Sequence, residues 1–204
     1  MNRLAAINRF YSSLSELENW LGEKRLLSQC DGRMKWPRRG VYFFFEKGET
    51  RENSNNERVV RVGTHAVSKG SGTTLWNRLR THRGTISGPH KDGGNHRGSI
   101  FRLHVGTAIL NRKRLRDDYP TWGRGSSASR KIRNKEYPIE KRVSHHIRSM
   151  PFLWLEVDDE PSKHSMRAYL ERNAIALLSN YQKLGTINAI DPPVKELVGP
   201  PLCE

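Results

Sequence analysis

The chain has 204 residues, of which 36 are Lys or Arg and 21 are Asp or Glu, so its formal net charge is +15. No apolar run is long enough to cross a bilayer, the first residues lack the apolar segment of a secretory signal, and the two cysteines stand far apart. These features exclude a transmembrane protein, a disulfide scaffold and a cysteine-rich zinc module. The charge predicts a polyanionic partner, with nucleic acid as the first candidate and a merely basic surface as the alternative. We expect a cytoplasmic protein without a membrane partner.

The first part of the chain predicts a helix, a β-hairpin and a second helix. Apolar residues at steps of three and four predict the first helix over 3–27, with Gly22 as a candidate interruption. Residues 41–46, VYFFFE, predict a strand buried on both faces, and residues 59–64, VVRVGT, predict its antiparallel partner across a polar loop. The second helix, LWNRLRTHR at 75–83, ends at a glycine.

The second part of the chain predicts three more elements around a strongly basic segment. Residues 99–110 fit a helix better than a strand, PFLWLEV at 151–157 is typical of a strand, and a periodic helix begins at 166. Residues 111–149 hold twelve Lys and Arg against four acids. Their GRGSSASRK stretch is typical of a partly flexible insertion.

These elements predict an α/β (α+β) fold, with a small mixed sheet built on an antiparallel hairpin plus a third strand and flanked by helices. The length fits one domain with an arm and an insertion. We divide the chain into an N-terminal helical arm (1–39), a central domain (40–190) with the basic insertion (111–149), and an extended proline-rich tail (191–204).

The last predicted helix carries a carboxylate, Glu171, in an apolar arc. Its neighbours three, four and seven residues on are Ala174, Ile175 and Leu178. Burying a carboxylate there is costly unless a cation or a metal ion meets it. Two interpretations stay open: an ion pair with Arg167, four residues back, or a metal ligand on a helix that faces the core.

The helix at 75–83 places two chemically useful side chains beside its apolar seam. Leu75 and Leu79 anchor this helix inward. Arg78 and His82 therefore lie on or beside the buried side. A guanidinium held by packing is a preset phosphate clamp, and an imidazole one turn on can shuttle a proton or hold a phosphate. The alternative is an ordinary basic helix whose long side chains reach out to solvent.

Several features in chain order resemble one nuclease superfamily. The sequence carries GVY at 40–42, RVG at 61–63, Arg78 and His82 on one helix, and Glu171 and Asn188 downstream. This set resembles the GIY-YIG nuclease superfamily, which places its two tripeptides on a hairpin, an essential arginine on the next helix and a metal-binding glutamate later in the chain. The resemblance covers residues 40–84 and 151–190.

The resemblance implies a metal-dependent endonuclease that hydrolyses DNA phosphodiester bonds, with a restriction-like role favoured. It implies that Glu171 holds Mg²⁺ or Mn²⁺, that Tyr42 deprotonates or orients the attacking water, and that Arg78 neutralises the phosphate. His82 matches the histidine or tyrosine that many members carry one turn after the arginine.

Arg61 stands where the family usually has a tyrosine, the first residue of the second tripeptide. A cation at this place favours the phenolate form of Tyr42 if the two side chains meet. Arg61 could instead hold a phosphate, or it could mark a weakened enzyme. All three interpretations stay open at the level of sequence, because a strand slip of one residue would send Arg61 to the opposite face.

Exposed basic residues are the expected DNA contacts. They are Arg80 and Arg83 on the helix, and Arg130, Lys131 and Arg133 in the insertion. Double-stranded DNA is the expected partner, and cleavage of both strands by one site per chain requires a dimer or two sequential nicks. The alternatives are a DNA-repair nuclease and a non-catalytic nucleic-acid-binding protein on the same scaffold, in which Tyr119 and Trp122 stack on bases.

Overall fold

The computed structural model describes residues 3–51 and 55–179, which form two compact units. The first, which we call the sheet unit, contains residues up to 25, residues 32–75 and the described residues from 151 onward. The second, the helical unit, contains residues 26–31 and 76–150. The domain boundaries drawn from the sequence stay predictions, and the proline-rich tail and Asn188 lie outside the described residues.

The sheet unit confirms the predicted α/β class. Its elements are α1 (Arg3–Leu21), β1 (Arg25–Leu26), β2 (Gly40–Thr50), β3 (Glu57–Gly63), β4 (Pro151–Glu156) and α5 (Met166–Leu178). The strand order is β1-β4-β2-β3, and β2 runs antiparallel to both of its neighbours. The predicted hairpin plus third strand therefore forms the centre of the sheet.

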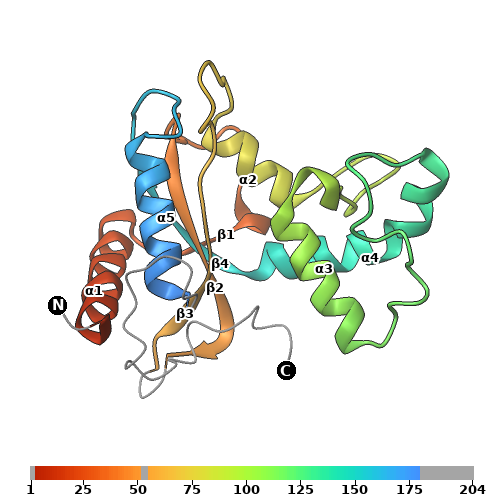
Figure 1. The fold of residues 1–204 in the computed structure, drawn as a ribbon, viewed down its shortest axis with the longest axis horizontal. Helices are drawn as coiled ribbons and strands as arrows, with labels where there is room; N and C mark the ends of the chain where they lie inside the picture. Colours follow the sequence, from red (N-terminus) through yellow and green to blue (C-terminus); the bar gives the residue numbers. More distant parts are fainter. Residues whose placement is uncertain (1–2, 52–54, 180–204) are drawn as a thin grey trace. The chain divides into compact units, whose positions relative to one another are not determined.

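Strand β2 is buried on both faces, as its run of aromatics predicts. Side chains alternate between the two faces of a strand, so Val41, Phe43 and Phe45 enter a core with residues of α1 and α5. These two helices lie side by side, with α1 against β4 and α5 against β2 and β3 (Figure 1). On the other face, Phe44 stacks on Phe152 with ring centroids 5.2 Å apart. Each such buried side chain contributes about 1.5–3 kcal/mol to folding.

Helix α1 ends at Leu21, six residues before the predicted end at 27. Gly22 adopts a φ of +89°, a left-handed conformation that ends helices and that only glycine adopts without strain. The chain then turns into the short strand β1 and a 3₁₀ turn, η1 (Leu27–Gln29). The apolar residues beyond Gly22 are thus core residues of other elements, which a helical period alone does not distinguish.

The helical unit is built from three helices. Most of α2 (Leu75–Arg83), the 3₁₀ turn η2 (His96–Gly98), α3 (Ile100–Arg112) and α4 (Arg130–Ser149) belong to it. The helical alternative for residues 99–110 is confirmed, and the Ser99 hydroxyl caps α3 by accepting the Arg102 N–H at 3.2 Å. No helix among the described residues is long and apolar enough to cross a bilayer.

Residues 130–149 of the basic segment form α4, a helix that was not predicted from the sequence. Two of the acids in this segment are buried ion-pair partners rather than surface charges. Glu136 accepts two hydrogen bonds from Arg97, at 2.6 and 2.9 Å, and Glu140 accepts from Arg102 at 2.5 Å. Charges paired in this way can be buried, and these pairs fix α4 to η2 and to α3.

The buried carboxylates of α4 are held in their ionised form. Burial alone raises the pKa of the Glu140 carboxyl, but the hydrogen bond from His96 and the charge of Arg102 outweigh it and hold the pKa below its ordinary value. His96 donates from Nδ1 to Glu140 at 2.9 Å, while its Nε2 accepts the Gly123 N–H at 3.2 Å. This pairing defines the Nδ1-protonated neutral tautomer of His96.

Trp122 is not available to stack on nucleic-acid bases, so that part of the binding alternative is wrong. Its side chain is only 5% exposed and stacks on His96, with ring centroids 3.8 Å apart. A Cβ at Gly106 of α3 would lie 2.0 Å from the indole ring. The indole is therefore a core side chain of the helical unit, which its neighbourhood of basic residues conceals in the sequence.

Candidate functional site

The hairpin register places Arg61 and Tyr42 on one face of the sheet. Tyr42 of β2 pairs with Gly63 of β3, and Phe44 pairs with Arg61. Paired residues on neighbouring strands point to the same face, as do residues two apart on one strand. Arg61 is therefore a diagonal neighbour of Tyr42, because the nearest register shift of the hairpin falls between Phe44 and Phe45, beyond the Phe44–Arg61 pair.

The ring of Tyr42 lies directly over Gly63. A Cβ at Gly63 would be 2.3 Å from the Tyr42 hydroxyl oxygen, far inside van der Waals contact. Tyr42 is fully buried, and its ring meets that of Phe44 edge to face at 5.8 Å. The last residue of the RVG tripeptide thus leaves the space that the last residue of GVY fills.

Glu171 reaches the same end of β3 from helix α5. Its Oε1 accepts the N–H of Thr64, the residue after Gly63, at 3.1 Å. The Thr64 hydroxyl in turn donates to the Gly40 carbonyl at 2.8 Å. Both tripeptides and the predicted metal ligand are therefore joined around the Gly63–Thr64 segment, although Glu171 is more than 100 residues from either strand in sequence.

The predicted alternative partner of Glu171, Arg167, is committed elsewhere, so the ion-pair interpretation is wrong. The Arg167 guanidinium donates to the Asp159 carboxylate and to the His65 carbonyl. Burial alone raises the pKa of Asp159, but the hydrogen bonds and charge of Arg167 outweigh it and lower that pKa below its ordinary value. The ion pair holds the start of α5 against the segment that precedes it, and the hydrogen bond to the His65 carbonyl ties α5 to the loop after β3.

Glu171 has the character of a single carboxylate ligand for a hard divalent ion. It is half-buried, and in the described part of the chain its Oε2 has no hydrogen bond and its carboxylate has no ion pair. Those residues also contain no cluster of three or more His, Cys, Asp or Glu. Mg²⁺ and Mn²⁺ are commonly held by one or two carboxylates, with water and substrate oxygens completing the shell. The donor set fits such an ion.

Arg61 retains an uncompensated charge on the Tyr42 face. Its side chain is half-buried, and its Nε makes no hydrogen bond with any residue that the structure describes. No acid in those residues forms an ion pair with it. A cation without a counter-ion can bind an anion such as a phosphate oxygen.

The other two predicted site residues, Arg78 and His82, belong to the helical unit. Arg78 is half-buried and donates to the Gly98 carbonyl at 3.4 Å, a long hydrogen bond. His82 is fully buried, and its Nδ1 lies 2.8 Å from the Ser99 hydroxyl. Its ring also meets the Phe101 ring edge to face. These contacts make His82 a packing residue between α2 and the start of α3.

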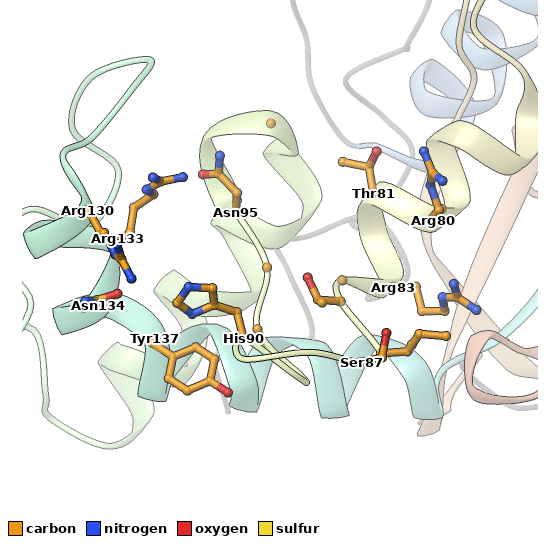
Figure 2. A pocket seen from close by; sticks show the side chains of 16 residues that line it. Arg80, Thr81, Arg83, Ser87, His90, Asn95, Arg130, Arg133, Asn134 and Tyr137 are labelled. Atoms are coloured by element: carbon orange, nitrogen blue, oxygen red, sulfur yellow. The ribbon is translucent and has the colours of Figure 1, made fainter.

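Four of the five predicted DNA-contact residues line one cavity in the helical unit, which we call the basic cavity. Its volume is about 820 Å³, and it lies among the end of α2, the loop 84–98 and one face of α4. Figure 2 shows Arg80 and Thr81 on one side, Arg130, Arg133, Asn134 and Tyr137 on the other, and His90 and Asn95 between them. Lys131 does not line it.

The arginines of the basic cavity differ in how firmly they are held. Burial lowers the pKa of the Arg83 guanidinium, and the nearby charge of Arg148 lowers it further. This guanidinium packs over the Trp76 ring at 4.7 Å and donates to the Cys30 carbonyl at 2.5 Å. Arg83 is therefore held in place as part of the cavity wall, whereas the exposed Arg80, Arg130 and Arg133 remain available to a ligand.

Sequence reasoning missed Thr64 and the uncharged half of the basic cavity. The N–H of Thr64 is a backbone group, so no side-chain pattern points to it. The cavity had a usable signal, because positions 130, 133, 134 and 137 follow the steps of one helix face. That signal was hidden by the expectation that this segment is flexible.

Comparison with known proteins identifies one family. A family model described as a GIY-YIG domain matches residues 1–200 of the chain. No curated protein and no solved structure matches it.

Proposed function

The chain belongs to the GIY-YIG domain family, and from that premise we propose that it is a metal-dependent endonuclease that hydrolyses DNA phosphodiester bonds. Members of this family are generally nucleases that act on DNA. The observation that best supports activity in this chain is the meeting of both tripeptides and Glu171 at the end of β3. The free cation Arg61 beside Tyr42 is the chain's departure from the family pattern.

In this proposal Glu171 holds Mg²⁺ or Mn²⁺, and the ion supplies stabilisation of the negative charge that develops on the phosphate. Tyr42 takes the proton of the attacking water or orients that water. Arg61 lies on the same face of the sheet and offers its unpaired charge to a phosphate oxygen. The phosphate contact expected of Arg78, which belongs to the helical unit, stays a prediction, and the loss of such a contact typically slows a reaction by about 10²–10³-fold.

The proposed substrate is double-stranded DNA. A net charge of +15 favours a polyphosphate backbone, and the arginines of the basic cavity supply contacts beyond the catalytic residues. The restriction-like role and the pairing of two chains stay predictions, which mapping of the cut positions on both strands and a measured molecular mass address.

A plasmid assay tests the proposal. The protein is incubated with supercoiled plasmid in Mg²⁺ and, in parallel, in EDTA. We expect nicked or linear DNA in Mg²⁺ only, and loss of cleavage in Tyr42→Phe. Glu16→Gln is a surface control, because Glu16 is an exposed acid on α1 far from β3 in sequence and its replacement should leave cleavage unchanged.

The second candidate is a non-catalytic DNA-binding protein on the same scaffold. The observation that favours it is the full burial of Tyr42, since a proton acceptor must meet the attacking water. Retarded plasmid that remains supercoiled in Mg²⁺ and in Mn²⁺ would support this candidate and contradict the nuclease.

A further inference from the structure

The basic cavity of the helical unit has the size and walls of a ligand site. Cavities that hold small ligands measure about 300–1,000 Å³, and this one has about 820 Å³. One wall is a single face of α4, and the end of α2 forms another. Its lining includes Gly84, Gly93 and Gly94, where a Cβ would collide with the Gly93 carbonyl, the Tyr137 ring and the Arg102 guanidinium, so these glycines let the loop pack closely against the rest of the helical unit.

The charge of the basic cavity is uncompensated. Its lining residues include four arginines and no acid. The side chains of Arg80, Arg130 and Arg133 make no hydrogen bond or ion pair with any residue that the structure describes. The acid in the neighbouring loop, Asp92, is already bound by Arg148 at 2.5 Å. Three unengaged guanidinium groups around one space favour an anion with several oxygen acceptors, such as a phosphodiester.

The uncharged side chains of the basic cavity suit a nucleobase. The Tyr137 ring is fixed, because its hydroxyl donates to a loop carbonyl at 2.5 Å and its ring meets that of His90 at 5.8 Å. Asn95 accepts a backbone N–H at 3.1 Å through Oδ1, which leaves its amide N–H groups to donate. The Asn134 amide has no hydrogen bond to a described residue. Aromatic rings stack on bases, and amides pair with base edges.

We propose that the basic cavity receives one unpaired nucleotide of a DNA strand, with its base against Tyr137, Asn95 and Asn134 and its phosphates against the unengaged arginines. The inference rests on the proposed DNA substrate. In a paired duplex the base is covered by its partner and its stacked neighbours, so only an extruded or already unpaired nucleotide presents base and phosphate together. Contact with paired backbone alone would leave the amides and the aromatic ring without a role.

A binding experiment in EDTA tests this proposal without cleavage. Two short duplexes of one sequence, one fully paired and one with a single bulged nucleotide, are compared by fluorescence anisotropy at one salt concentration. We expect the bulged duplex to bind about tenfold more tightly, because stacking of one base contributes an effect of that order. Equal affinities for the two duplexes would overturn the proposal.

Variants on α4 locate the preference. Asn134→Ala keeps the charge and should reduce the bulge preference severalfold, while affinity for the paired duplex stays near that of the parent. Lys135→Gln is the control, since Lys135 is an exposed cation on the same helix that does not line the cavity. It should retain the preference. An unchanged preference in Asn134→Ala, or an equal loss in Lys135→Gln, would contradict the proposal. Melting curves check that both variants fold.

A free nucleotide is the competing occupant. If a deoxynucleoside monophosphate alone binds as tightly as the bulged duplex, the cavity is a site for free nucleotides and the proposal is wrong. The outcome is separate from that of the plasmid assay. A protein that cleaves plasmid but shows no bulge preference refutes only the cavity proposal, and a protein with the preference but no cleavage refutes only the nuclease.

Discussion

Replacing Gly63 with alanine should displace Tyr42 and disable the site. The added Cβ would lie 2.3 Å from the hydroxyl oxygen, 2.4 Å from Cζ and 2.6 Å from Cε2, whereas ordinary contacts begin at 3.4 Å. The ring would have to retreat by about 1 Å into the Phe44 side of the core, and overpacking of this kind costs about 1–3 kcal/mol. A misplacement of about 1 Å in a catalytic group slows a reaction by about 10²-fold.

The measurement pairs Gly63→Ala with Gly72→Ala. A Cβ at Gly72 meets nothing within 4 Å, so this control adds the same methyl group in open space. Plasmid cleavage and thermal unfolding are recorded for both variants. We expect Gly63→Ala to lose most of its activity and to melt several degrees lower, at about 2–4 °C per kcal/mol. If it cleaves and melts like Gly72→Ala, the ring of Tyr42 does not depend on Gly63 and the geometric account of the two tripeptides fails.

Three further predictions concern charge. Arg61→Met removes the cation but keeps most of the stem, so it should weaken DNA binding at low salt, and an affinity equal to that of the parent would rule out a phosphate contact by Arg61. Joint replacement of Arg130, Lys131 and Arg133 by alanine should reduce the slope of log binding constant against log salt concentration by about 0.9 per lost phosphate contact. An unchanged slope would show that α4 does not touch DNA. The folded-state pKa of Glu140 is lowered, so its stabilisation is present above the ordinary value of 4.5 and is lost as pH falls through the folded pKa. In urea unfolding near pH 7, Glu140→Gln should be about 3–5 kcal/mol less stable than the parent. Below pH 4.5 the variant should lose less stability than the parent, and equal losses in the two proteins would contradict this.

The sheet and its hairpin could be predicted because their signals are local. The aromatic run that becomes β2 is bounded by glycines, and α2 begins at Leu75 and ends at Arg83 as its caps and periodicity predict. The end of α1 could not be placed as well, since Leu26 and Leu27 continue the apolar pattern beyond Gly22. What ends the helix is a backbone conformation, and the apolar residues after it serve other elements.

The candidate site was only partly visible in the sequence. Glu171 could be singled out because a carboxylate in an apolar arc needs a partner. Its hydrogen-bond donor, the backbone N–H of Thr64, comes from a distant part of the chain, which no spacing rule gives. Arg167 pairs instead with Asp159 in the irregular segment before α5, where no helical period applies. The burial of Glu140 could not be predicted either, because its partners His96 and Arg102 lie in a different segment of the chain.

The most direct test of the central claim is the rate of cleavage of a defined duplex as a function of Mg²⁺ concentration, for the parent protein and for Glu171→Gln. The account predicts saturable, metal-dependent cleavage by the parent, none in EDTA, and at least a 10²-fold slower rate for the variant, whose melting temperature stays near that of the parent. Equal rates for the two proteins, or cleavage by the parent in EDTA, would contradict the assignment of Glu171 as the metal-holding residue of a nuclease.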